Sequence, residues 1–102
     1  MSKAHIARIA RELDLASVPE DWTGVDAVLP ILERMRSERA VVILKLDGER
    51  TGPEDNGPYT MVVSGVPLGE DFIRIDAPTM EDALTYVIAR YASNHRGIPL
   101  PA

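Results

Sequence analysis

Two apolar runs flanking a polar segment do most to limit what this chain can fold into. The runs are Ala40–Asp47 and Tyr59–Ser64, and both contain β-branched residues typical of strands. The segment between them, Gly48–Pro58, is rich in glycine, proline and charged residues, and it is far longer than a tight hairpin needs. We predict two strands joined by this segment, and a loop of this length within a small domain is typical of a functional or mobile element.

A third run, Phe72–Asp76, alternates between apolar and polar residues. Ile73 and Ile75 share one face, as expected for a sheet with one buried face. The run Ala40–Asp47 differs, because its first half is apolar on both faces. We expect that strand to lie at the centre of the sheet or to have its second face covered.

Two N-terminal segments have helical periodicity. The first spans Ser2–Leu15, with Ser2 as its cap and apolar residues at positions 6, 9, 10 and 13. The second is expected to begin at Asp26 as N-cap and to end near Glu38. This start places Pro30 in the first turn, where the missing N–H has no partner within the helix.

The C-terminal helix has the clearest signals. Thr79 is the expected N-cap, with Asp82 three residues later, and Gly97 is the expected left-handed C-cap. One face carries the apolar residues Met80, Ala83, Leu84, Val87, Ile88 and Tyr91.

These elements predict an α+β fold in the order ααβββα. Short connections between consecutive strands favour a three-stranded antiparallel meander, with helices packed mainly on one face. We expect a single small domain over residues 1–102, with residues 96–102 as an extended tail. The helix of residues 1–15 needs a surface to pack against, either at the periphery of this domain or on a second copy of the chain.

Composition and charge restrict the function classes. The chain has no cysteine, which excludes disulfides and thiolate metal sites. The net charge of −5 arises in residues 46–102, which carry four basic and nine acidic side chains, whereas residues 1–45 carry seven of each. Such a surface repels nucleic acid and attracts basic partners. No secretory signal and no apolar run of membrane-spanning length is present, so we expect a cytoplasmic protein without a membrane partner.

No set of residues indicates a reaction. We expect the two histidines to be structural, with His5 facing solvent and His95 in the last helical turn. Neither a nucleophile elbow nor a phosphate-binding glycine loop is present. Asp47 and Asp76 end two strands and could approach one another, but their positions are explained by the turns that follow.

The loop carboxylates raise the question of a metal. Counted as a calcium loop from Asp47, the segment lacks the carboxylate required at the twelfth place. A cage of another kind, built from Asp47, Glu49, Glu54 and Asp55, is an alternative. We otherwise expect no cofactor and no metal.

We therefore predict a non-catalytic binding or regulatory module, in one version an acidic protein that docks on a basic partner. The predicted contact residues are Glu49, Glu54, Asp55, Glu70 and Asp71. One alternative is a self-associating structural protein, in which a homodimer covers spare apolar surface by sheet face or by helix exchange. The other alternative is a small carboxylate-based metal-binding protein or enzyme.

If the acidic version is right, affinity for the basic partner should fall as salt is raised, because exposed charges are screened. Affinity capture from cell extract at low and high salt measures this. An affinity that does not change with salt would contradict the acidic version.

Overall fold

The three strands form one antiparallel sheet in sequence order. In the computed structural model, which describes residues 2–52 and 56–101, β1 (Ala40–Leu46) pairs with β2 (Tyr59–Gly65), and β2 pairs with β3 (Ile73–Ala77). The predicted meander is confirmed. β1 lies at an edge of the sheet, so its expected central position is wrong.

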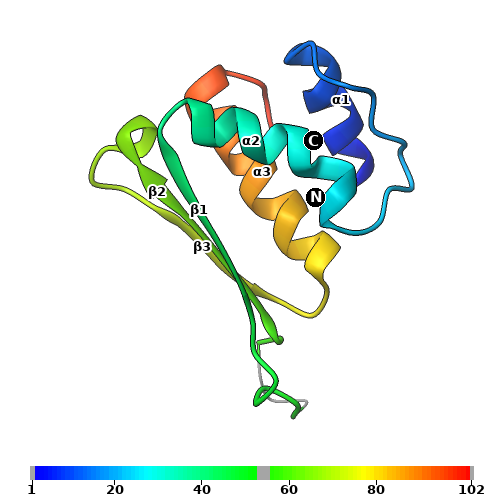
Figure 1. Cartoon of the computed structure of the whole chain (residues 1–102), viewed down its shortest axis with the longest axis vertical. Helices are drawn as coiled ribbons and strands as arrows, with labels where there is room; N and C mark the ends of the chain where they lie inside the picture. The colour runs from blue at the N-terminus through cyan, green and yellow to red at the C-terminus, as the bar shows by residue number, and fades with distance from the viewer. Residues whose placement is uncertain (1, 53–55, 102) are drawn as a thin grey trace.

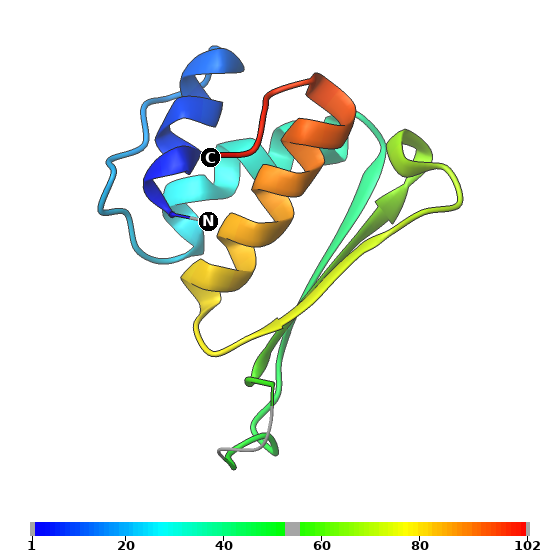
Figure 2. The same ribbon diagram turned by 180° about the vertical axis from the view of Figure 1, so that it is seen from behind.

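All helices lie on the same side of this sheet (Figures 1 and 2). They are α1 (Ala4–Glu12), α2 (Leu29–Ser37) and α3 (Met80–Arg96), with short 3-10 turns η1 (Val25–Val28) and η2 (Val66–Leu68). The predicted order of helices and strands is therefore confirmed. In the part of the chain that the structure describes, no helix is long and apolar enough to cross a membrane.

The core lies between α3 and the inner face of the sheet. Met61 and Val63 of β2 are fully buried, and they belong to one cluster with Leu84 and Val87 of α3. This face follows from the alternation of side chains along each strand, which puts every second residue toward the helices.

α1 packs against α3 and contributes to the same core. Its residues Ile6, Ile9 and Ala10 are 0% exposed. Trp22, in the connector after α1, is hydrogen-bonded to the residue that precedes the helix. Its indole N–H donates to the carbonyl of Lys3 at 2.8 Å, and the Lys3 ammonium donates to the Trp22 carbonyl at 2.8 Å.

α2 begins later than predicted. Asp26 lies inside η1 and caps no helix, because the chain first makes a 3-10 turn there. The α-helix starts at Leu29, preceded by Val28 without a side-chain cap. Pro30 lies in the first turn of α2, as expected.

α3 has the predicted ends. The side chain of Thr79 accepts a hydrogen bond from the Asp82 N–H at 3.1 Å, and Gly97 adopts the left-handed conformation with φ 68°. Acidic Glu81 and Asp82 occupy the first turn, where the helix dipole favours negative charge.

Only glycine can occupy position 57 without strain, because of its backbone conformation and its close contact with the backbone of Ala77. Its φ is 121°, and a Cβ at this position would lie 2.1 Å from the carbonyl oxygen of Ala77. Next to it, the Asp47 N–H donates to the Pro58 carbonyl at 2.8 Å. The close contact between the backbones of Gly57 and Ala77 therefore helps to position the β1–β2 hairpin against the end of β3.

We expect Gly57→Ala to lower the free energy of unfolding by about 2 kcal/mol or more, because it adds both a clash and an unfavourable φ. Urea denaturation followed by circular dichroism measures the loss. Gly48→Ala is the matched control, since Gly48 has open space around its Cα, and it should change stability by less than about 0.5 kcal/mol. Equal effects of the two variants would contradict this account.

Candidate functional site

No described helix lies on the face of the sheet that points away from α1, α2 and α3 (Figures 1 and 2), and the Arg50 side chain covers only one end of it. We call it the outer face. By strand alternation and register it is formed by Val41, Ile43, Lys45, Thr60, Val62, Ser64, Phe72, Arg74 and Asp76.

One part of the outer face is apolar. Val41 is 51% exposed, Ile43 is 52% exposed, and Phe72, the residue before β3, is 64% exposed. Val62 lies opposite Ile43 on β2 and is half-buried. An exposed apolar group of this kind is typical of a surface that another protein covers. The second face of β1 is therefore apolar, as expected, but uncovered in the single chain.

The other part of the outer face is a network around Arg50. The Arg50 Nε lies 3.4 Å from an Asp47 oxygen, and its Nη1 lies 3.1 Å from an Asp76 oxygen. Asp76 also accepts a hydrogen bond from the Thr60 hydroxyl. Asp47 and Asp76 do come close together, with Arg50 between them, a role that the sequence analysis did not foresee for this loop residue.

The network does not form an acid–base pair. The hydrogen bond from Thr60, with help from Arg50, lowers the pKa of Asp76. The backbone N–H of Glu49 does the same for the pKa of Asp47. Both carboxyls stay ionised at neutral pH, whereas acid–base catalysis by two carboxyls needs one of them to hold its proton.

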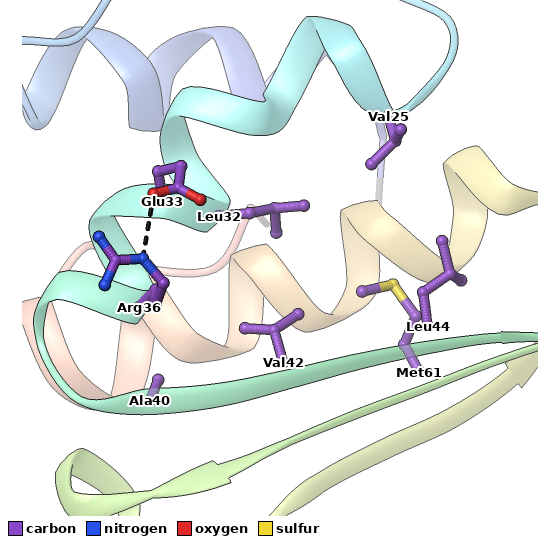
Figure 3. A pocket seen from close by; sticks show the side chains of 8 residues that line it. All are labelled: Val25, Leu32, Glu33, Arg36, Ala40, Val42, Leu44 and Met61. Carbon is purple, nitrogen blue, oxygen red and sulfur yellow. Dashed lines mark hydrogen bonds and ion pairs between the residues drawn. The ribbon is translucent and has the colours of Figure 1, made fainter.

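A groove of about 250 Å³ lies on the helix side of the sheet, between α2 and β1. Figure 3 shows Leu32 of α2 and Val42 of β1 in its opposite walls, with the Glu33–Arg36 ion pair at the rim. The remaining lining residues are Val25, Ala40, Leu44 and Met61. The lining is mostly aliphatic and offers no convergent group for chemistry.

The free edge of β1 runs along this groove. Hydrogen bonds at both ends of the β1–β2 pair, from Asp47 to Pro58 and from Val66 to Arg39, show that the odd-numbered residues of β1 bond to β2. The backbone groups of the even-numbered residues therefore point to the free edge. Such an edge, next to an apolar groove, has the geometry that accepts an extended chain.

The densest polar cluster surrounds Glu38, after the last turn of α2. The Tyr91 hydroxyl donates to Glu38 at 2.6 Å, and Arg34 and Arg96 also bond to its carboxylate. His95 Nε2 lies 3.7 Å from the same carboxylate. The cluster joins the C-terminal ends of α2 and α3.

The charges in the Glu38 cluster indicate a structural role, in which the cluster links the C-terminal ends of α2 and α3. Burial raises the pKa of Glu38, but the Tyr91 hydrogen bond and the nearby cations outweigh it, and the pKa is lowered. Burial and the bond to Glu38 raise the pKa of Tyr91 well above its usual value. The cavity beneath the cluster holds about 10 Å³, which is barely the space of one water molecule.

The expectation that His5 faces solvent is wrong. His5 is 8% exposed, because it lies on the buried side of α1. Burial and the nearby Arg8 lower its pKa, so the imidazole is neutral at pH 7. His95 lies in the last turn of α3, as expected.

The predicted acidic contact residues do not form one surface. Glu49 follows β1 at one end of the sheet, whereas Glu70 and Asp71 follow η2 at the other, about 20 Å away along β2 at the usual rise per residue. Glu54 and Asp55 lie outside the described residues. Within residues 2–52 and 56–101, no group of three or more His, Cys, Asp or Glu side chains could hold a metal.

Comparisons with protein-family models, with curated proteins and with solved structures found no match.

Glu38→Gln should be less stable than the wild type by about 1–2 kcal/mol at pH 7, because hydrogen bonds to a charged acceptor are lost. A lowered pKa in the folded state gives stability that is present above the ordinary value of 4.5 and is lost as pH falls through the folded value. The difference between the proteins should therefore shrink below that pH. Urea titrations at several pH values measure it.

The control is Glu33→Gln, which breaks the exposed ion pair with Arg36 at 3.0 Å. Its effect should stay below about 0.5 kcal/mol at every pH. If Glu38→Gln loses no more stability than this control at pH 7, the Glu38 cluster does not contribute to the free energy of unfolding.

Proposed function

We propose that the chain is a non-catalytic protein-binding module and that its binding surface is the outer face of the sheet. The observation that carries this proposal is the exposure of Val41, Ile43 and Phe72 on one face of the sheet. Exposed aliphatic and aromatic side chains contribute binding energy when a partner removes them from water.

Two features of the face support binding rather than chance exposure. Ile43 lies opposite Val62, and Val41 lies opposite Ser64. Continued by one residue, the β2–β3 register places Phe72 on the other side of Ser64, diagonal to Val62, so the apolar residues are near neighbours with Ser64 among them. Beside them, Arg50 holds Asp47 and Asp76 in fixed positions. An apolar centre with charged groups at its border is the usual composition of a protein interface.

The positions of the acidic residues favour the outer face, rather than the acidic loops, as the binding surface. Glu49 lies at the opposite end of the sheet from Glu70 and Asp71. A basic partner would therefore have to span the sheet to contact all three, and docking through acidic residues stays a prediction. The alternative of an enzyme has no support from the Arg50 network or the Glu38 cluster, whose carboxyls are both held ionised.

The test is affinity capture from the native extract with three baits: the wild type, Ile43→Glu and Leu46→Glu. Leu46 is the matched control because it lies on β1, is 61% exposed and faces the helix side. A specific partner should be captured by the wild type and by Leu46→Glu, and lost with Ile43→Glu. Capture should persist at high salt, since apolar contacts are not screened.

Two results would overturn the proposal. One is that the wild type captures nothing, neither another protein nor an untagged copy of this chain. The other is that Ile43→Glu captures the same partner as well as the wild type does. Circular dichroism of each bait checks that the variants are folded.

A further inference from the structure

The geometry points to a second copy of this chain as the partner on the outer face, in a two-fold dimer that packs sheet against sheet. This inference rests on the proposed function and names the partner of the same surface. Two observations carry it: the area of the face, and the pairing of its charged groups within one chain.

The area is enough for a dimer of moderate affinity. Strands about 4.8 Å apart, with a rise of about 3.3 Å per residue, give a face of roughly 15 Å by 20 Å. Because side chains project from the sheet, the accessible surface is larger than this outline, about 500 Å² per copy. A dimer would bury about 1,000 Å² in total, which is near the lower limit for a specific interface. We therefore expect a reversible, concentration-dependent dimer rather than an obligate one.

The charges on the outer face are compatible with a second copy. Lys45 lies 3.3 Å from Asp47, and Arg74 lies 3.4 Å from Asp76, so positive and negative groups are already paired within one chain. Two such faces can approach without leaving a buried charge unpaired. The acidic side chains of Glu49, Glu70 and Asp71 lie beyond the two ends of the face.

A two-fold axis brings the apolar part of one face onto the apolar part of the other. Each isologous interface uses the same patch twice, so Val41, Ile43 and Phe72 would meet their equivalents in the second copy. Stacked sheets pack about 10 Å apart with interdigitating side chains, and branched aliphatic residues suit this packing.

Helix exchange, the other route to a dimer, has no comparable support. Ile6 and Ile9 of α1 are already fully buried in their own chain. The groove between α2 and β1 also provides apolar surface, but Glu33 and Arg36 stand at its rim and nothing in the structure identifies what fills it.

The experiment is sedimentation equilibrium of the purified full chain over a concentration range of about 1 µM to 1 mM, which covers the affinities expected of a small interface. The wild type should shift from the mass of one chain to the mass of two. Added salt should strengthen the dimer or leave it unchanged, because each copy carries a net charge of −5 and the copies repel one another.

Ile43→Glu should stay at the mass of one chain throughout, a loss of at least tenfold in association. Leu46→Glu carries the same net charge and should associate like the wild type. If Ile43→Glu does not fold, Phe72→Glu replaces it, since Phe72 is 64% exposed and lies outside the strand pairing.

A wild type that stays at the mass of one chain overturns the inference. Loss of association by Leu46→Glu with retention by Ile43→Glu also overturns it, because the contact would then be on the helix side. The proposed function is judged separately by the capture experiment. A single-chain wild type that captures a different protein through Ile43 refutes the homodimer and keeps the binding module.

Discussion

The packing of α3 across the inner face of the sheet is the interaction on which the rest of the structure depends. Leu84 and Val87 of α3 share one core with Met61 and Val63 of β2. α1 then packs on α3, and Glu38 ties the end of α2 to α3 through Tyr91. Each helix is therefore added to the side that α3 already occupies. Within residues 2–52 and 56–101 no helix lies on the outer face, and this one-sided arrangement leaves the proposed binding surface exposed.

The elements that local chemistry defines could be predicted from the sequence. The α3 boundaries follow from a side-chain cap at Thr79 and a left-handed glycine at Gly97, and the strands follow from period-two patterns. The start of α2 could not be predicted in this way. Asp26 is a residue type that favours an N-cap, but it lies inside a 3-10 turn, and the α-helix begins after it at Leu29 without a side-chain cap.

The candidate site was predicted only in part, because it depends on which elements become neighbours. The two apolar faces of β1 are visible in the sequence, but the central position predicted from them is wrong, because strand order places β1 at the edge. Within the described residues its second face is exposed rather than covered. His5 lies on the buried side of α1 because α1 packs on α3, which no local pattern reveals. The bridge that Arg50 makes between Asp47 and Asp76 likewise joins a loop to a distant strand.

The contacts that close the β1–β2 hairpin fix the strand register independently of the length of the loop. The Asp47 N–H bonds to the Pro58 carbonyl, and Gly57 fits against the backbone of Ala77, so the strands are aligned before the loop begins. Closing a longer loop costs little, about 0.6 kcal/mol for each doubling of its length. Residues 48–52 and 56–58 of the connection lie past the end of the sheet, away from the helices (Figure 1). A foreign peptide for display is therefore best grafted between Gly52 and Asn56, which keeps Arg50 and its contacts on the outer face.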